Sequence, residues 1–394
     1  MKILYRAPLV VPVISPPIED GAVLVENGVI VAVDRFYALK GEARVKDHEG
    51  AILTPALFNC HTHLELSHLA LLGKEERKGT DITDWISSLL AERALSGADP
   101  LAAGRRQLAA FHEQGVIGLA DIGNLPQSRD IRQGSDVRAF FFLEMLGLGQ
   151  EAAENVMGRL ADLDCDCTAH APYSVNELLL RELKKRSIGR GHLFPIHVAE
   201  SETEIRFLLD GAGPLRDFVE QRGVWDNSFH PPGCGSVAYL DRIGVLDEKT
   251  LCVHCVHVTD DEIALLALRK ARVCLCPASN RYLGVGKSPV SRMLAAGLLP
   301  CLGTDSAASN PAMSIWEEMH ILRADHPGID PADIFRMATL GGAVALGESR
   351  MGMLAPGMVP SFLAVQSQGI TADDVHEFLT GVGASVQVDW VEEG

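Results

Sequence analysis

The chain has 394 residues, of which 47% are hydrophobic and 22% charged, a balance that excludes a disordered protein. Its formal net charge of −17 disfavours nucleic acid or an anionic membrane surface as the main partner. The N-terminus lacks the apolar run of a signal peptide, and no stretch is apolar enough to cross a bilayer, so we expect a cytoplasmic protein. The nine cysteines are an odd number and several alternate within apolar runs, which predicts reduced thiols packed on buried strands.

Residues 1–53 predict a small antiparallel sheet. Short apolar runs alternate there with turn signals, and Asn27-Gly28 between two of the runs is typical of a hairpin, because both residues readily adopt positive φ. Short strands return after about residue 354. We therefore expect the two ends of the chain, residues 1–53 and 354–394, to form a small β-sandwich domain.

Residues 54–353 alternate apolar runs with longer helix-compatible segments, which is the pattern of βα units. The runs predicted as parallel strands are 53–60, 116–122, 137–146, 165–171, 193–199, 250–256, 272–277 and 299–304. Eight strands with crossover helices over about 300 residues predict an α/β fold of the (β/α)₈ TIM-barrel type. Helices are expected at 84–94 and 331–340, and a long loop over the barrel mouth at 211–236.

His61 and His63 stand at the end of the first of these strands. Residues i and i+2 of a strand point to the same face, so the two imidazoles are expected to aim at one point. Taken alone, such a pair is more often two ordinary strand-end histidines. Other predicted strands, however, also end in residues that bind metals or move protons: His170, His197, His254 and Asp305. Because barrel active sites gather at the C-terminal ends of the strands, this shared position favours one site.

Three imidazoles and one carboxylate suit a catalytic divalent cation, Zn²⁺ above all, with Fe²⁺ as the alternative. We predict one metal ion held by His61, His63, His197 and Asp305. Water bound to such a metal loses a proton near neutrality, so the pattern predicts metal-assisted hydrolysis. Glu200 lies three residues beyond His197, where it could shuttle a proton to or from a substrate.

These residues resemble the amidohydrolase superfamily, and within it the deaminase and chlorohydrolase branch that acts on aminated heterocycles. The resemblance covers essentially the whole chain and is carried by His61-Thr62-His63, His170-Ala171-Pro172-Tyr173, His197-Val198-Ala199-Glu200, His254-Cys255-Val256-His257, Pro277-Ala278-Ser279-Asn280 and Gly303-Thr304-Asp305. It implies that Glu200 protonates a ring nitrogen, that His254 and Asp305 orient and deprotonate the attacking water, and that His170 lines the pocket. The region 165–173 offers no lysine that could be carbamylated to bridge two metals, which favours a mononuclear site.

Four further residues are candidates for substrate contacts. In adenosine-type members of the branch a carboxylate near the opening segment serves the sugar, so Glu65 and Glu144 are expected in that role by analogy. Trp85, on the helix expected at 84–94, is a further candidate. Arg281 follows the seventh strand and is expected either to bind an anionic or carbonyl group or to be a solvated surface arginine.

The expected activity is a metal-dependent aminohydrolase, which hydrolyses a C–N bond of a cyclic amidine and releases ammonia from an aminated purine. An adenine nucleoside is preferred, namely adenosine, S-adenosylhomocysteine, methylthioadenosine or 6-aminodeoxyfutalosine. The alternatives are deamination of guanine, cytosine or triazine-type rings, carbon–halogen or amide hydrolysis at the same site, and a non-catalytic metal-binding protein. The expected partner is a small aminated heterocycle without nucleic acid or membrane, and a homodimer is left open.

Overall fold

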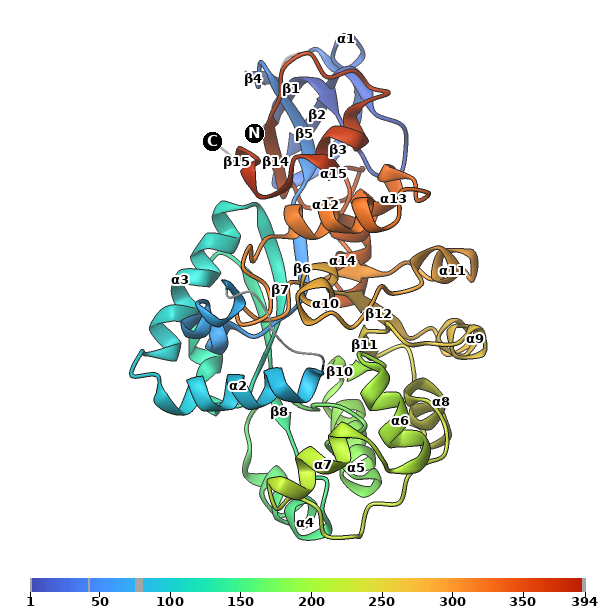
Figure 1. The fold of residues 1–394 in the computed structure, drawn as a ribbon. Coiled ribbons are helices and arrows are strands. Elements are labelled where there is room, and N and C mark those ends of the chain that lie inside the picture. The colour runs from blue at the N-terminus through green and yellow to red at the C-terminus, as the bar shows by residue number, and fades with distance from the viewer. Residues whose placement is uncertain (1, 42, 75–80, 392–394) are drawn as a thin grey trace.

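A seven-stranded mixed sheet lies at one end of the molecule and contains strands from both ends of the chain (Figure 1). The computed structural model describes residues 2–41, 43–74 and 81–391. The strands of this sheet are β1 (Lys2–Val10), β2 (Ile18–Glu26), β3 (Val29–Arg35), β4 (Arg44–Asp47), β5 (Ala51–Pro55), β14 (Phe362–Gln366) and β15 (Val388–Trp390). Asn27 and Gly28 join β2 to β3 with φ values of 52° and 74°, so the predicted hairpin is confirmed.

The β-sandwich expected from the two chain ends is not confirmed in the described residues. β14 pairs antiparallel with β5, with Phe362 opposite Pro55 and Gln366 opposite Ala51. β15 then continues the same sheet beyond β14. The C-terminal strands therefore extend the N-terminal sheet at an edge that would otherwise expose unpaired backbone groups.

The larger part of the molecule is α/β and contains two four-stranded parallel sheets. The first consists of β6 (Leu57–Thr62), β7 (Val116–Gly123), β8 (Arg138–Met145) and β9 (Cys167–Ala169). The second consists of β10 (Phe194–Val198), β11 (Thr250–His254), β12 (Arg272–Leu275) and β13 (Cys301–Leu302). Each strand overlaps one of the eight predicted runs, which confirms the α/β class, although one closed eight-stranded sheet is not assigned within the described ranges.

Backbone hydrogen bonds join the facing edges of the two parallel sheets. The amides of Thr304 and Asp305, just beyond β13, each donate to the carbonyl of His61 on β6 at 3.0 Å. At the other edge, the amide of His197 on β10 donates to the carbonyl of His170, just beyond β9, at 2.9 Å. These contacts bring C-terminal strand ends from both sheets to one place.

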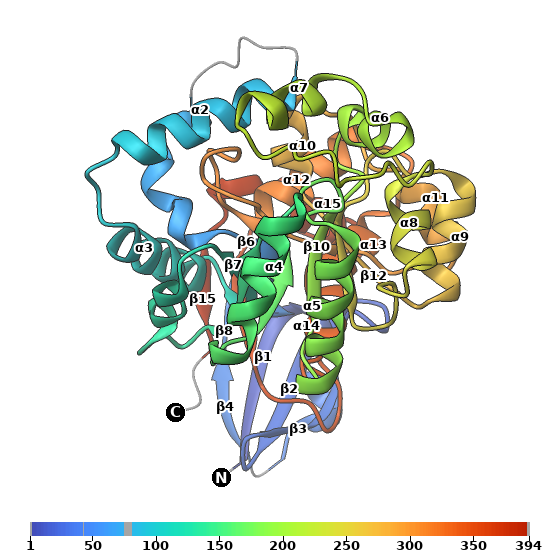
Figure 2. The same ribbon diagram turned by 90° about the horizontal axis from the view of Figure 1, so that it is seen from below.

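Helices surround the strands of the α/β part (Figures 1 and 2). The helices before residue 230 are α1 (Phe36–Leu39), α2 (Ile82–Leu95), α3 (Pro100–Glu113), α4 (Gln150–Arg159), α5 (Glu177–Arg190), α6 (Glu202–Asp210) and α7 (Pro214–Gln221). The helices after residue 230 are α8 (Ser236–Arg242), α9 (Asp260–Leu268), α10 (Pro277–Leu283), α11 (Val290–Ala295), α12 (Ile315–Asp325), α13 (Pro331–Arg336), α14 (Gly342–Leu346) and α15 (Val375–Gly381). None of the helices in the described part of the chain combines the length and apolar character of a membrane-spanning segment.

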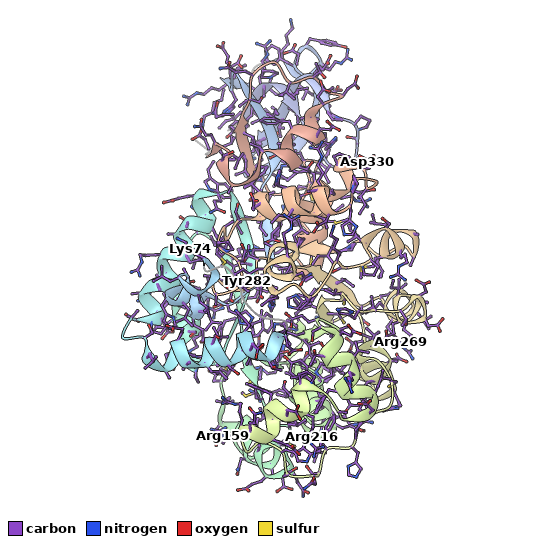
Figure 3. The ribbon with its side chains drawn as sticks, viewed as in Figure 1. Lys74, Arg159, Arg216, Arg269, Tyr282 and Asp330 are labelled. Atoms are coloured by element: carbon purple, nitrogen blue, oxygen red, sulfur yellow. The ribbon has the colours of Figure 1, made fainter. Side chains whose placement is uncertain are left out.

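Both predicted helices are present, but the second ends in a different helix type, and the loop predicted at 211–236 contains a helix. The helix expected at 84–94 is α2, and the one expected at 331–340 begins as α13, where Asp330 accepts from the amide of Ala332, and continues as a π-helical turn over 337–341 (Figure 3). The stretch 211–236 is not a loop throughout, because α7 occupies part of it. Pro214 stands at the start of α7, where its fixed φ favours the helix instead of interrupting it.

Two contacts place helices against the mouth of the α/β part. Tyr282 on α10, near the centre of Figure 3, donates from its hydroxyl to the carbonyl of Leu72 at 2.6 Å. Asp81, the N-cap of α2, accepts from the hydroxyl of Thr203 on α6 at 2.6 Å. The helix α2 therefore begins beside α6 and α7, and its C-terminal end leads toward α3 (Figure 2).

Candidate active site and metal centre

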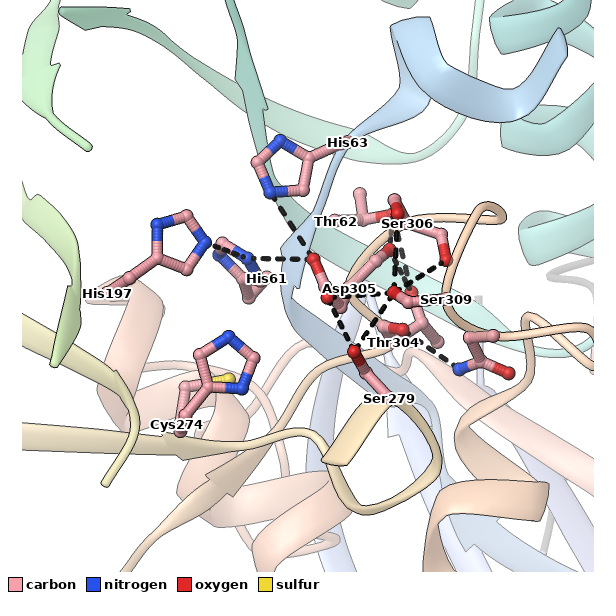
Figure 4. A network of polar contacts seen from close by, with 12 residues as sticks. His61, Thr62, His63, His197, Cys274, Ser279, Thr304, Asp305, Ser306 and Ser309 are labelled. Carbon is pink, nitrogen blue, oxygen red and sulfur yellow. Dashed lines mark hydrogen bonds and ion pairs between the residues drawn. The ribbon is translucent and has the colours of Figure 1, made fainter. Parts of the chain in front are cut away.

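Four buried side chains with metal-binding atoms lie together at the strand ends: His61, His63, His197 and Asp305 (Figure 4). The Nε2 atoms of His197 and His61 are 3.1 Å apart. The Oδ1 atom of Asp305 is 3.4 Å from Nε2 of His61 and 3.3 Å from Nε2 of His63. Ligands at about 2.0–2.2 Å from a tetrahedral or five-coordinate metal are about 3.0–3.5 Å from one another. The four atoms therefore have the spacing of one coordination shell.

The geometry of β6 explains why the first two histidines share a direction. His61 lies on the strand and His63 follows it, and their ring centroids are 4.8 Å apart. Thr62 between them forms a parallel bridge with Asp305, and its hydroxyl donates to the Asp305 carbonyl at 3.1 Å. Asp305 has a φ of 56°, an uncommon value for a non-glycine residue that turns the chain at the end of β13. The pairing of β6 with the segment after β13 thus places the carboxylate beside both imidazoles.

The carboxylate of Asp305 is oriented by two serine hydroxyls (Figure 4). Its Oδ2 atom accepts from Ser279 Oγ at 2.7 Å and from Ser309 Oγ at 2.9 Å. These bonds leave Oδ1 facing His61 and His63. Burial alone would raise the pKa of Asp305, but the hydrogen bonds from the two histidines hold it well below its usual value. The carboxylate therefore stays ionised, which is the form that binds a cation.

The three histidines differ in how strongly their surroundings favour the neutral imidazole, which is the form that binds a metal. His197 Nδ1 donates to the carbonyl of His170 at 2.9 Å, which leaves a lone pair on Nε2. Burial, together with the neighbouring His61, lowers the pKa of His197 well below its usual value, and burial lowers that of His61 to about 4. Burial also lowers the pKa of His63, but the Asp305 carboxylate raises it more, to about 9. A cation among these four atoms would take the place of that proton, so the residues present fit one divalent metal ion.

Glu200 and His254 lie beside this cluster. His254 is the last residue of β11, and its Nε2 atom is 3.6 Å from Glu200 Oε1. The Oδ1 atom of Asn280 accepts from His254 Nδ1 at 2.9 Å, so the proton lies on Nδ1 and Nε2 can accept. This Nε2 atom is buried and has no hydrogen-bond partner among the described residues. Burial raises the pKa of Glu200, which favours a carboxyl group that holds a proton.

Glu144 and His170 lie on the other side of His197. Glu144 Oε2 accepts from Asn124 Nδ2 at 2.9 Å, whereas Glu144 Oε1 is 3.7 Å from His197 Nδ1. Within the described ranges this buried Oε1 atom has no hydrogen-bond partner. His170 Nδ1 contacts Ser174 Oγ at 2.7 Å, and its ring centroid is 4.9 Å from that of His197. An unpaired buried carboxylate oxygen is unfavourable, so Glu144 is available to accept from a ligand.

Both carboxylate oxygens of Glu65 accept hydrogen bonds from other residues of the protein. Its Oε1 atom accepts from Arg93 Nη2 at 2.7 Å, and its Oε2 atom accepts from the amide of Leu125 at 3.0 Å and from Ser128 Oγ at 2.8 Å. Arg93 also donates to Asn124 Oδ1 at 3.0 Å. Glu65 thus joins α2 to the segment after β7. Its role as a substrate contact stays a prediction.

The other two substrate-contact candidates are Trp85 and Arg281. Trp85 on α2 donates from Nε1 to the carbonyl of Ala308 at 3.2 Å, which holds the helix against the segment after β13. The guanidinium of Arg281 on α10 donates to Asp325 at 2.9 Å, and its side chain is 50% exposed. The structure does not bring Arg281 into the cluster, and both assignments stay predictions.

Sequence reasoning missed the residues that orient the site. Ser279 and Asn280 belong to the motif Pro277-Ala278-Ser279-Asn280, which assigns them no role in the sequence; in the structure Ser279 donates to Asp305 and Asn280 accepts from His254. Arg93, Asn124 and Ser128 carried no recognisable signal, because their partners come from segments distant in the chain.

Comparisons with known proteins agree with this geometry. Residues 143–386 match the model of the Amidohydrolase family. The chain is 30% identical over 331 residues to the aminodeoxyfutalosine deaminase of Deinococcus radiodurans, covering 77% of this chain and 75% of that protein. A crystal structure of an adenosine deaminase from Xanthomonas campestris with bound zinc is 25% identical, with a TM-score of 0.75 over 98% of this chain and 90% of that one. The Helicobacter pylori aminofutalosine deaminase in complex with methylthio-coformycin shares the fold, with a TM-score of 0.84, 23% identity and 95% coverage of both chains.

Proposed function

The chain belongs to the amidohydrolase family, and from that premise we propose that it is a metal-dependent deaminase that releases ammonia from an adenine nucleoside. One observation carries the proposal. The cluster of His61, His63, His197 and Asp305 has the spacing of a metal coordination shell, and a buried carboxyl and an accepting imidazole lie next to it. This combination suits hydrolysis of a C–N bond, since the reaction needs an activated water, a proton acceptor and a proton donor.

His61, His63, His197 and Asp305 are the residues that would hold the cation, with Zn²⁺ first and Fe²⁺ second in preference. When bound, the cation supplies Lewis acidity and lowers the pKa of a water molecule. Only one such ion is proposed, since the donor atoms at the end of β9 include no lysine side chain.

The protein's own groups then move the protons. Glu200 donates a proton to the ring nitrogen next to the amino-bearing carbon, and His254 Nε2 and the Asp305 carboxylate orient the attacking water and accept its proton. The water oxygen bonds to the ring carbon and forms a tetrahedral adduct. The proton taken by His254 and Asp305 passes to the amino group, the hydroxyl of the adduct returns a proton to Glu200, and the C–N bond breaks so that ammonia leaves. The net reaction takes up one water and releases one ammonia, leaving a carbonyl at that carbon.

The substrate class is supported from two directions. Glu144 Oε1, buried and unpaired in the part of the chain that the structure describes, offers an acceptor for a sugar hydroxyl next to His197. The relatives named above are deaminases of adenosine and aminodeoxyfutalosine, both of which are adenine nucleosides. We propose 6-aminodeoxyfutalosine, adenosine, methylthioadenosine and S-adenosylhomocysteine as the substrates to compare, each bearing a 6-aminopurine base.

The test is an ammonia-release assay on metal-loaded protein with these four nucleosides, with guanine and cytosine as reference compounds. We expect ammonia from at least one of the 6-aminopurine nucleosides, together with the ultraviolet change from an adenine to a hypoxanthine base. Release of ammonia from none of the four nucleosides by protein carrying one metal ion per chain would overturn the proposal.

Three further properties stay predictions. They are the division of the chain into 1–53 with 354–394 and 54–353, the cytoplasmic location, and a homodimer. Closure of the two parallel sheets into one barrel is also proposed, and it is supported by the backbone hydrogen bonds at both facing edges.

A further inference from the structure

A buried carboxylate outside the metal cluster holds the turn that carries Glu200. Glu204, on α6, is 0% exposed. Its Oε1 atom accepts from the amide of Ala199 at 2.8 Å, and its Oε2 atom accepts from the amide of Glu200 at 2.9 Å. Ser236, the first residue of α8, donates from Oγ to the same Oε1 atom at 2.5 Å. Glu204 therefore binds two consecutive backbone amides and a hydroxyl, all of them donors.

The turn held by Glu204 has an unusual backbone. Ala199 has a φ of 52°, in the left-handed region that residues with a Cβ rarely adopt. On the opposite side of this residue, the Ala199 carbonyl accepts from the amides of Val256 at 3.0 Å and His257 at 2.9 Å. The peptide between β10 and α6 is thus clamped from both sides. Because the backbone is fixed at this point, the direction of the Glu200 side chain is fixed as well.

Holding a turn with a buried ionisable side chain is energetically unfavourable. A carboxylate in a fully buried position loses the hydration of its charge, and Glu204 has only neutral donors as hydrogen-bond partners. Burial accordingly raises the pKa of Glu204 to about 7. A side chain whose only task was packing would be apolar here. The carboxylate instead accepts from two consecutive backbone amides, which fixes their position.

We propose that Glu204 is a positioning residue for proton transfer: it fixes the Ala199–Glu200 peptide so that the Glu200 carboxyl stays within reach of the substrate and of His254. The catalytic half of this inference rests on the proposed function, in which Glu200 is the proton donor. A glutamine at position 204 has one carbonyl oxygen and one amide group. Its amide would face an N–H donor, so one of the two backbone bonds would be lost.

The first experiment is a double-mutant cycle on turnover with Glu204→Gln, Glu200→Gln and the double variant. We expect Glu204→Gln to lower kcat by about 10-fold or more, since misplacing a catalytic group by about 1 Å can cost up to 10²-fold. KM and metal content are expected to change less than about 2-fold, because neither group binds the metal. In the Glu200→Gln background the same substitution should change kcat less than about 2-fold. Equal losses in both backgrounds, or unchanged kcat in folded Glu204→Gln protein, would overturn the proposal.

Glu262→Gln is the matched control. Glu262 is also buried and also accepts from backbone amides, those of Val237 at 3.2 Å, Ala238 at 3.3 Å and Thr259 at 3.0 Å. Its substitution should lower the melting temperature while kcat stays within about 2-fold of the wild-type value. If Glu204→Gln does not fold, Glu204→Asp takes its place in the cycle with the same criteria, because its shorter side chain can reach at most one of the two amides.

A second readout does not depend on activity. Amide hydrogen exchange at residues 199 and 200 should be about 10-fold faster in Glu204→Gln than in the wild type, which corresponds to the loss of one hydrogen bond, and unchanged in Glu262→Gln. The two proposals can fail separately. If the wild type releases no ammonia but exchange at residues 199 and 200 is still faster in Glu204→Gln than in the wild type, the proposed function is refuted and the clamp is not. Unchanged exchange at these two amides would refute the clamp itself.

Discussion

The metal side and the substrate side of the site are built in different ways. On the metal side, His61, His197 and Asp305 lie on strands or directly after them, and backbone pairing between strand ends brings them together. On the substrate side, Glu65 and Glu144 are held by side chains from α2 and from the segments after β7. The first arrangement follows from the topology of the sheets, whereas the second depends on individual side-chain contacts. We therefore expect changes on the metal side to abolish turnover and changes on the substrate side to alter selectivity.

The largest effect is expected from Asp305→Ala. Removing the carboxylate leaves three imidazoles without their anionic partner, so the protein should lose its metal ion and at least about 10³-fold in turnover, since a catalytic metal contributes several kcal/mol. Elemental analysis and ammonia release measure the two effects. Asp241→Ala is the matched control, because Asp241 forms an ion pair with Arg269 on the outer helices. Full metal content and turnover in Asp305→Ala would remove this residue from the site.

Glu200→Gln should come next, with metal content unchanged and turnover reduced by about 10²-fold or more, the range for general acid–base catalysis. A glutamine keeps the shape of the side chain but cannot donate the proton to the ring. The exposed neighbour Glu202 provides the control variant Glu202→Gln, which should be fully active. Wild-type turnover in Glu200→Gln would show that another group protonates the substrate.

On the substrate side, Glu144→Gln should reduce kcat/KM by about 10-fold for nucleosides with sugar hydroxyls, because a hydrogen bond to a charged group contributes about 1.5–3 kcal/mol. The glutamine carbonyl can still accept from Asn124, which leaves an amide donor where Oε1 now offers an acceptor. The comparison is a 2′,3′-dideoxynucleoside, for which we expect less than about 2-fold change. An equal loss for both substrates would show that Glu144 acts through His197 and not through the sugar.

The smallest effect concerns the pH dependence of stability on the metal side. Glu318 on α12 accepts from the amide of Ala278 at 2.9 Å and from Asn310 at 2.6 Å, and burial raises its pKa to about 8. Its folded-state pKa is therefore above the unfolded value, so its contribution to stability is complete at acidic pH and is lost as the pH rises toward about 8. In Glu318→Gln, the decrease in unfolding free energy between pH 5.5 and pH 6.5 should be smaller by about 1 kcal/mol. Urea denaturation at the two pH values measures it, and an identical decrease in both proteins would contradict the assignment.

The same contrast explains how much of the molecule could be predicted from the sequence. The spacing of His61 and His63 and the apolar run before them were enough to place both imidazoles on one face, because strand parity is local. His197 and Asp305 could be added because they, too, follow predicted strands. By contrast, nothing local in the sequence indicates that Arg93 would bind Glu65, since the contact depends on where α2 crosses the strand ends.

The features of the fold that the sequence left undecided have similar causes. Which strand the segment near residue 362 would pair with could not be predicted, because different long-range pairings have the same alternation of residues. In the stretch 211–236, the prolines and glycines that predict a loop include Pro214, which starts α7, because proline is also favoured at the first position of a helix. Local patterns identified the elements, and the long-range pairing decided their partners.

The most direct test of the central claim is a metal titration of metal-free protein, followed by ammonia release from a 6-aminopurine nucleoside. We predict that the metal-free protein is inactive, that activity rises linearly to one equivalent of Zn²⁺ per chain, and that Asp305→Ala shows no such rise. Full deaminase activity in protein shown to be metal-free, or no ammonia release at one bound equivalent, would contradict the account.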